Sequence, residues 1–320
     1  MQLYAGARWA LRADWLSREA CARAIGRLDW TSSPGYPYML RAPNNGILFK
    51  VVEGRPSPDM VEWAWSAVQQ RIAGAQPDPL RLFVKPEAHT AAKLEAEKYR
   101  LISSVSVIDQ LLDHMLFDEM NDQLISNWHA VPSKPGWSIF SGGWRYMPQE
   151  TWIATDASSW DWTVRPWLLE MALQLRMGLC ENLDQQWVDL ASRRYRELFG
   201  HPEFITSGGL KLRQKTPGVM KSGCVNTIAD NSLMQVLLHV RVSLELGIAV
   251  QPIFTMGDDR LQAPMERESD YYDLTAQFCI LKSVKHENEF AGFRFRGRRV
   301  EPVHKGKHAY NLLHLNQAVV

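Results

Sequence analysis

The stretch QPIFTMGDDRLQAP, residues 251–264, places a glycine and two aspartates between two short apolar runs. Gly257, Asp258 and Asp259 are typical of a tight turn, and the flanking runs have the alternation of short strands. The stretch therefore predicts a β-hairpin that carries two adjacent carboxylates at its tip. Taken alone, the pattern does not separate a structural turn from a place that holds a metal ion, because Gly and Asp both favour turns.

A second pair of carboxylates follows another predicted strand. TWIATD, residues 151–156, is a short apolar run that ends in Asp156, and Asp161 follows it in DASSWD. A carboxylate at the end of a strand and another at the tip of an adjacent hairpin can face each other, and carboxylate oxygens are the ligands that Mg²⁺ prefers. The two segments together predict a metal site.

A third polar segment is SGCVNTIADNS, residues 222–232. A small Ser222-Gly223 loop lets a backbone approach a ligand closely, and the residues after it enter a helix. Thr227 and Asn231 are four positions apart, so they share one helix face. The alternative is a serine cap followed by ordinary polar positions on an amphipathic helix.

The order of predicted elements indicates the fold class. Apolar spacing and turn residues predict helices over 8–28, 57–74, 107–124, 166–180, 184–199, 224–246 and 268–279, and strands over 80–85, 99–106 and 151–156. FITSGGLKLR at 204–213 predicts a second hairpin with a Gly-Gly turn, and EFAGFRFRG at 289–297 predicts one strand. This order is that of an α+β protein with an antiparallel centre, not of a doubly wound sheet.

Composition restricts the class of protein further. The 320 residues are 46% apolar and 22% charged, with 36 Lys and Arg against 35 Asp and Glu, as in a folded protein without a global basic excess. Local patches such as RRYR (193–196), RFRGRR (294–299) and HKGKH (304–308) would have to hold any nucleic acid, although each is also typical of a solvated face. Four cysteines without a CxxC pair suggest neither a zinc ribbon nor a disulfide framework. Charged residues interrupt every apolar stretch, so we expect no secretory signal and no membrane span.

The three polar segments, in this order, resemble motifs A, B and C of viral RNA-dependent RNA polymerases. The D-x₄-D of the first, the SGxxxTxxxN of the second and the GDD of the third are all present. RLFVKPEAH with the following KYRLISSVSVIDQLLDHMLF resembles motif F, and SSPGYPY at 32–38 resembles the motif G loop. The segments FVKPEAH, TDASSWDWTV and PGVMKSGCVNT most resemble the polymerase sequences of the sobemovirus and polerovirus group of positive-strand RNA viruses.

The resemblance implies an α+β right-hand polymerase fold with fingers, a palm built on an antiparallel sheet flanked by helices, and a short or truncated thumb. The fingers would occupy 1–150, with motif G near 32–38 and motif F near 81–102. The palm would occupy 151–299, with a fingers insertion near 184–216, and 300–320 would begin the thumb. A full thumb needs several helices, so we expect a minimal thumb, a piece of a longer polyprotein or a partial sequence.

The resemblance also implies a role for individual residues. Asp156 and Asp258 would hold two Mg²⁺ or Mn²⁺ ions, with Asp259 a less direct ligand, and Lys282 and Lys285 compete for the role of general acid toward pyrophosphate. Lys85 and Arg100 would bind the triphosphate. The ribose would be recognised by Asp161, Ser222, Thr227 and Asn231. The residues at the template or primer RNA would be Ser33, Pro34, Gly35, Gly223 and Phe290; Phe290 lies where motif E is expected, although EFAGFRF lacks the Cys-Ser pair usual in this group.

The implied activity is template-directed nucleotidyl transfer that replicates a positive-strand viral RNA genome. The implied partners are the RNA template, the nascent RNA, nucleoside triphosphates, and other viral or host replication proteins. The implied location is the host cytoplasm, in membrane-associated complexes reached through partners. A reverse transcriptase is the nearest rival, but such enzymes usually carry a tyrosine where Gly257 stands and a bulky residue where Asp161 stands. A non-catalytic RNA-binding palm is the other rival, although every acidic residue needed for the metals is present.

Overall fold

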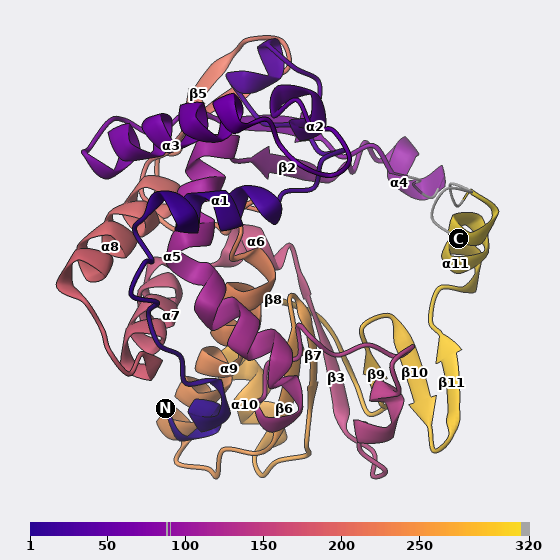
Figure 1. Ribbon diagram of the computed structural model, residues 1–320. Coiled ribbons are helices and arrows are strands. Elements are labelled where there is room, and N and C mark those ends of the chain that lie inside the picture. The colour runs from indigo at the N-terminus through magenta and orange to yellow at the C-terminus, as the bar shows by residue number, and fades with distance from the viewer. Residues whose placement is uncertain (88, 90, 315–320) are drawn as a thin grey trace. The chain divides into compact units, whose positions relative to one another are not determined.

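The computed structural model describes residues 1–87, 89 and 91–314 (Figure 1). Residues 88 and 90 of the expected motif F, and 315–320 of the expected thumb, lie outside the described residues. The chain divides into two compact units. The first comprises Met1, Arg8–Gln123 and Val164–Thr227, and the second comprises Gln2–Ala7, Leu124–Thr163 and Ile228–Val320.

The first unit combines a helical core with a mixed sheet. Its helices are α1 (Arg18–Gly26), α2 (Asn45–Leu48), α3 (Pro58–Ile72), α4 (Ala91–Glu95), most of α5 (Val107–Ser126), α7 (Pro166–Leu179), α8 (Gln185–Phe199) and the short 3₁₀ helix η2 (Tyr38–Leu40). Its strands are β1 (Leu80–Val84), β2 (Leu101–Ser104), β4 (Glu203–Thr206) and β5 (Lys211–Arg213), in the order β2-β1-β4-β5. The β1–β4 pair is parallel and the other two pairs are antiparallel. Apolar side chains of α1, α3 and α5 form the core.

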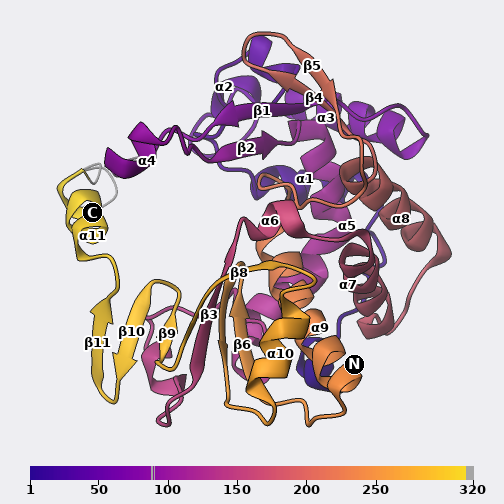
Figure 2. The ribbon, with the colours of Figure 1, turned by 180° about the vertical axis from the view of Figure 1, so that it is seen from behind.

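The second unit is built on an antiparallel sheet whose strands are β3 (Ile153–Ser158), β6 (Ile253–Met256), β7 (Asp259–Gln262) and β8 (Ile280–Lys285). Their order is β6-β7-β3-β8, so β7 and β3 are the two inner strands. Figure 2 labels β3, β6 and β8 of this sheet. A second sheet contains β9 (Glu289–Phe290), β10 (Phe293–Arg296) and β11 (Arg299–Pro302). The helices are α6 (Trp160–Thr163), α9 (Thr227–Leu246, from Ile228 onward), α10 (Glu268–Thr275), α11 (Lys305–Leu313) and the 3₁₀ helices η1 (Gln2–Ala7), η3 (Trp128–Ala130) and η4 (Gly143–Tyr146).

The predicted α+β class with an antiparallel centre is confirmed. Helices 57–74, 107–124, 166–180, 184–199 and 224–246 and both hairpins agree with α3, α5, α7, α8, α9, β4–β5 and β6–β7 within a few residues. The predicted helix over 268–279 ends earlier, at Thr275. Within the described residues, no helix combines the length and the apolar character that crossing a membrane requires.

The predicted helix over 8–28 is wrong in its first half, because α1 begins only at Arg18. The preceding segment is extended at Trp9, which exchanges backbone hydrogen bonds with the loop after α7: its N–H donates to the Leu179 carbonyl at 3.2 Å, and its carbonyl accepts from Glu181 at 2.9 Å. Trp9 is buried there. The helical spacing of its apolar residues therefore gives way to long-range contacts.

The single strand expected over 289–297 is also wrong. The chain turns back at Ala291 and Gly292, both with positive φ, so that β9 and β10 form a hairpin in which Phe290 pairs with Phe293. Two further strands, β8 and β11, were not predicted. Both have mostly exposed or half-buried side chains, so the apolar alternation that marks a strand in sequence is weak in them.

Candidate active site

The paired aspartates lie at the tip of the hairpin that the sequence predicts. Met256 pairs with Asp259, so Gly257 and Asp258 form a two-residue turn. Gly257 has φ +64°, which glycine adopts without the clash that a β-carbon would cause and which the first position of such a turn requires. Asp258 and Asp259 are both exposed.

Asp156 lies directly across from this turn in the same sheet. On the central strand β3 it pairs with Asp259 of β7 on one side and with Ser283 of β8 on the other. From the sequence we expected a carboxylate at a strand end to face the hairpin tip. The strand register places Asp156 opposite Asp259. The Asp156 side chain is 49% exposed, so its carboxylate is open to solvent.

The carboxylates repel one another. Desolvation by the surrounding protein and the charges of Asp258, Asp156 and Glu289 together raise the pKa of Asp259 to about 7. The residue is nevertheless exposed, so we give most weight to the crowding of like charges. A cation at these oxygens would relieve that repulsion. As they stand, no three His, Cys, Asp or Glu side chains of the described residues are arranged so that they could hold a metal ion.

The two candidate lysines on β8 have different partners. The ammonium of Lys282 donates to Asp156 Oδ2 at 2.6 Å. Lys285 instead pairs with Glu289 at 3.2 Å and lies 3.9 Å from Glu287. Only Lys282 therefore reaches the aspartate at the centre of the sheet.

Asp161 and Asn231 are brought together, as the resemblance implied. The Asn231 amide donates from Nδ2 to Asp161 Oδ1 at 2.8 Å. The indole of Trp160 donates to Asn231 Oδ1 at 3.0 Å, so the amide is held at both ends. Sequence reasoning missed Trp160, although it directly precedes Asp161 in DASSWD.

Helix α9 holds the turn through two residues to which sequence reasoning gave no role. The N–H of Gly257 donates to Ser232 Oγ at 2.9 Å, and Gln235 Nε2 donates to the carbonyl of Asp258 at 2.9 Å. Both side chains are buried. The signal in the sequence was the polar continuation NSLMQ after Asn231, which places polar groups where an apolar face is expected.

Three predicted residues surround the loop that precedes α9, in the first unit. Ser222 Oγ accepts from the Ser103 N–H at 3.1 Å. A β-carbon at Gly223 would lie 2.5 Å from the Ser103 carbonyl oxygen, so only glycine fits there. The Thr227 hydroxyl donates to the carbonyls of Lys221 and Cys224, each at 2.8 Å. These contacts show a tightly packed loop rather than an exposed cap.

The predicted triphosphate ligands lie side by side at the ends of β1 and β2. The Lys85 N–H donates to the Arg100 carbonyl at 2.8 Å, and both cations approach Glu87, at 3.1 and 3.7 Å. Lys85 and Arg100 are exposed, so their charges are accessible.

The predicted RNA-contacting residues differ in accessibility. Gly35, with φ +71°, lies so close to the Val105 carbonyl that an added β-carbon would be 2.6 Å from its oxygen. The Pro34 carbonyl accepts from Val107 at 2.8 Å, and the Ser33 hydroxyl accepts from the Gly35 N–H at 3.4 Å. Phe290 is only 1% exposed and packs edge-on against the Trp137 ring, so its side chain supports the core of the second unit. A contact of Phe290 with primer RNA stays a prediction.

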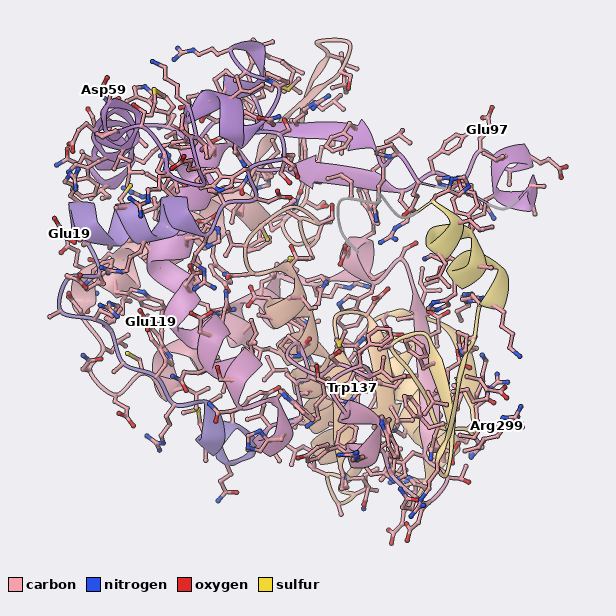
Figure 3. The ribbon with its side chains drawn as sticks, turned by 45° about the vertical axis from the view of Figure 1, so that its right-hand side comes forward. Glu19, Asp59, Glu97, Glu119, Trp137 and Arg299 are labelled. Atoms are coloured by element: carbon pink, nitrogen blue, oxygen red, sulfur yellow. The ribbon has the colours of Figure 1, made fainter. Side chains whose placement is uncertain are left out.

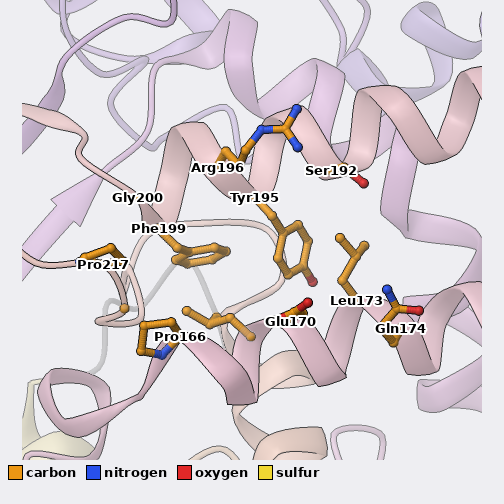
Figure 4. Close-up of a pocket in the computed structure, with 12 residues that line it drawn as sticks. Pro166, Glu170, Leu173, Gln174, Ser192, Tyr195, Arg196, Phe199, Gly200 and Pro217 are labelled. Atoms are coloured by element: carbon orange, nitrogen blue, oxygen red, sulfur yellow. The ribbon is translucent and has the colours of Figure 1, made fainter.

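A pocket of about 320 Å³ lies between α7 and α8 in the first unit (Figure 4). Tyr195, Phe199 and Leu173 give it an apolar lining, and Glu170 and Arg196 add charged groups. None of the predicted site residues lines it. The pocket is therefore separate from the residues described above.

Comparison with known proteins agrees with these motifs. A model of the viral RNA-dependent RNA polymerase family matches residues 16–284. The chain is 34% identical to Protein P1-P2 of Potato leafroll virus (strain Potato/Netherlands/Wageningen/1989) over 258 residues, which cover 74% of this chain and 23% of that protein. It is 29% identical to Replicase polyprotein P2AB of Cocksfoot mottle virus over 289 residues, or 84% of this chain and 30% of that protein. The chain thus spans about a quarter of the length of the curated relatives it matches.

A solved structure gives the fold. The Sicinivirus 3Dpol RNA-dependent RNA polymerase superposes with a TM-score of 0.72 at 18% identity, over 92% of this chain and 66% of that chain. This likeness confirms the predicted α+β polymerase fold, and the relatives confirm the predicted polerovirus and sobemovirus group. Because the family model spans most of the sequence, this chain belongs to the viral RNA-dependent RNA polymerase family.

Proposed function

We propose that this chain is an RNA-directed RNA polymerase that copies a positive-strand viral RNA genome. The observation that carries the proposal is the pairing of Asp156 with Asp259 across β3 and β7, beside the Asp258 turn and with Lys282 bound to Asp156. Carboxylates brought together from two strand segments are the arrangement that phosphoryl transfer requires. The family membership supports the same chemistry.

The family depends on divalent metal ions, and the chemistry of these carboxylates suits Mg²⁺ or Mn²⁺, although no three such side chains of the described residues are gathered in the geometry of a metal site. Asp156 and Asp258 would hold two ions, with Asp259 as a neighbouring ligand, because hard carboxylate oxygens suit these cations. The raised pKa of Asp259 is consistent with this fit, since the charges of Asp258, Asp156 and Glu289 contribute to it. Held by these carboxylates, two such ions would supply the Lewis-acid chemistry that activates a 3′ hydroxyl and stabilises a pyrophosphate leaving group.

The chain's own residues orient the nucleotide and move the proton. Lys85 and Arg100 would neutralise the triphosphate, and the planar guanidinium of Arg100 suits bidentate contact with phosphate oxygens. Asp161, Asn231, Ser222 and Thr227 would recognise the ribose hydroxyls, which distinguish RNA from DNA. We assign the general acid for pyrophosphate to Lys282, because its ammonium lies at Asp156 whereas Lys285 is bound to Glu289.

The partners follow from the same chemistry. The template, the nascent strand and nucleoside triphosphates would be the substrates, with Ser33, Pro34, Gly35, Gly223 and Phe290 near the RNA. Further viral or host replication proteins would bring the chain to membrane-associated complexes in the host cytoplasm. The exposed cations between Arg296 and Lys307 are one surface for such RNA or protein contacts, with Arg299 at the outer edge of its sheet (Figure 3).

The decisive experiment is nucleotide incorporation on a short primed RNA with Mg²⁺ or Mn²⁺. We expect Asp258→Ala to lower incorporation by about a thousandfold, because it removes a charge on which transition-state stabilisation depends. Asp273→Ala, which removes an exposed carboxylate from α10 in the same unit, is the matched control and should leave incorporation unchanged. Incorporation that persists in Asp258→Ala would refute the metal assignment.

A further inference from the structure

We propose that Trp160 is a positioning residue for ribose selection: its indole N–H fixes the Asn231 amide and, through that amide, the carboxylate of Asp161. The inference rests on the proposed function and adds a residue to it. The contacts that carry it are the 3.0 Å bond from Trp160 Nε1 to Asn231 Oδ1 and the 2.8 Å bond from Asn231 Nδ2 to Asp161 Oδ1.

The chemistry of the three groups permits only one orientation of the amide. An indole N–H can only donate a hydrogen bond, so it must meet the amide oxygen. An ionised carboxylate can only accept, so the amide NH₂ must face Asp161. Rotating the amide by half a turn would place two donors together at Trp160 and two acceptors together at Asp161. Trp160 and Asp161 therefore bind the two ends of the Asn231 amide and fix its orientation. We call this arrangement the lock.

Burial makes the lock effective. Trp160 is 3% exposed and Asn231 is 4% exposed, so water cannot easily replace the indole as donor to the amide oxygen. Without the indole N–H, the buried oxygen would lose its partner, and a buried acceptor left unpaired is costly. The amide would then turn toward another donor, and Asp161 would lose the hydrogen bond from Asn231 Nδ2.

The backbone before Trp160 supports the same reading. Ser159 has φ +53°, a left-handed conformation that residues other than glycine adopt rarely. Its carbonyl accepts from the N–H groups of Trp162 and Thr163, at 2.9 and 3.3 Å, and so begins α6. This turn presents two consecutive side chains, Trp160 and Asp161, to one amide of α9. Strain of this kind is found where the surrounding contacts demand a particular geometry.

The consequence is a specific effect on selectivity. Asp161 and Asn231 are the residues proposed to recognise the ribose hydroxyls, and polar groups that pair with a substrate hydroxyl discriminate against the analogue that lacks it. Trp160 contributes no contact of its own to the nucleotide in this scheme. It acts by keeping Asn231 and Asp161 in the orientation that the hydroxyl needs.

The test measures the ratio of kcat/KM for ribonucleotides to that for 2′-deoxyribonucleotides on a primed RNA. Trp160→Phe keeps the ring and removes only the N–H, and we expect it to lower this ratio by about tenfold, as loss of one hydrogen bond to a buried group predicts. Trp162→Phe, the same change at an exposed site two residues away, should leave the ratio unchanged. Trp187→Phe removes a buried indole bond to the Leu116 carbonyl in the other unit, and it should lower stability without changing the ratio.

A wild type that discriminates, together with a Trp160→Phe variant of equal selectivity, would overturn the inference alone. A wild-type chain that incorporates no nucleotide would instead overturn the proposed function and the selectivity role with it. If Trp160→Phe does not fold, exchange of the Trp160 indole proton in the wild type and in Asn231→Ala decides the matter. Slow exchange that becomes fast in Asn231→Ala supports the lock, and equal exchange in both overturns it.

Discussion

Lys282 owes its place beside Asp156 to an irregularity of the sheet. Along β3 and β8, Asp156 pairs with Ser283 and the next residue, Ala157, pairs with Leu281, so Lys282 is the extra residue of a β-bulge. A bulge re-aims a side chain that regular pairing would leave elsewhere, and such bulges are common next to active sites. From sequence spacing alone, Lys282 and Lys285 were equal candidates for the general acid. The change of register at the bulge could not be predicted, because the pattern of apolar residues does not show it.

The lysine assignment predicts different effects for the two β8 lysines. Lys282→Leu should lower kcat about a hundredfold, the usual contribution of a general acid, with a smaller change in KM for the nucleotide. Lys282→Arg keeps a cation beside Asp156 but cannot release its proton, so kcat should fall there too. Lys285→Leu is the matched control and should retain near-normal kcat. Steady-state kinetics over a pH series checks this, and an equal loss in Lys285→Leu would refute the assignment.

The residue scale also shows where reasoning from sequence stops. Asp156, Asp161, Asn231 and the Asp258 turn could be named because each stands in a recognisable pattern. Trp160 could not, since its role depends on an amide 71 positions away that only the folded chain brings to it. The side chains that hold a site in place have no motif of their own.

At the scale of elements, α9 and the β6–β7 hairpin form one hydrogen-bonded assembly. Ser232 supplies its hydroxyl oxygen to Gly257 and its backbone carbonyl to the Thr255 hydroxyl, at 2.9 Å each. Gln235, one turn further along, holds the Asp258 carbonyl. The helix therefore sets the position of the turn that carries the paired aspartates.

This assembly predicts that Ser232→Ala will affect stability and catalysis together. The Gly257 N–H would lose its acceptor, and we expect a loss of about 1–3 kcal/mol in the free energy of unfolding, with a fall in kcat that exceeds any rise in KM. Ser243→Ala on the same helix is the control. Its hydroxyl is buried without a hydrogen-bond partner among the described residues, so removing it should be neutral or stabilising. Urea unfolding and incorporation kinetics test both, and an unchanged kcat in Ser232→Ala would contradict the role of α9.

Elements were predictable where their own sequence determines them. The helical pattern of α9 and the apolar runs around Gly257 are strong because those segments are largely buried. The edge strand β8 buries little, and it forms because β3 supplies hydrogen-bonding partners. Residues 8–17 failed for a similar reason, since Trp9 is fixed by the loop after α7 rather than by a local helix.

At the scale of the molecule, the net charge is close to zero, but individual groups make the stability change with pH in opposite directions. Buried His239 accepts from the Tyr271 hydroxyl at Nδ1 and donates from Nε2 to the Gln251 carbonyl, at 2.7 and 2.8 Å. Burial and the charge of Arg260 together lower the pKa of His239 to about 4, while the hydrogen bond to the Gln251 carbonyl acts in the opposite direction. Asp259 has the opposite shift, with its pKa raised to about 7.

The two groups therefore contribute opposite slopes to stability. Between about pH 6.5 and 4 the unfolded state protonates His239 before the folded state does, so this group makes the free energy of unfolding fall as the pH falls. Over about pH 4 to 7 the folded state holds a proton on Asp259 that the unfolded state releases, so Asp259 makes the free energy of unfolding fall as the pH rises. In the wild type the two slopes partly cancel, and substitution separates them.

We expect His239→Gln to lower the free energy of unfolding most at pH 7 and progressively less toward pH 4. Between these pH values the loss should change by on the order of 3 kcal/mol at most. Asp259→Asn should instead be more stable than the wild type near pH 8, because the repulsion among its carboxylates is gone, and this advantage should vanish by pH 4. Asp273→Asn, at an exposed site on α10, is the control for a change in charge alone. Urea unfolding at pH 4, 5, 6, 7 and 8 measures the free energy of unfolding of all three variants.

A loss of stability in His239→Gln that does not vary with pH would show that the imidazole is not held neutral by burial. A site built to bind cations is stabilised when one of its negative charges is removed. An Asp259→Asn variant that is less stable than the wild type at pH 8 would therefore show that the carboxylates of the site do not repel one another appreciably.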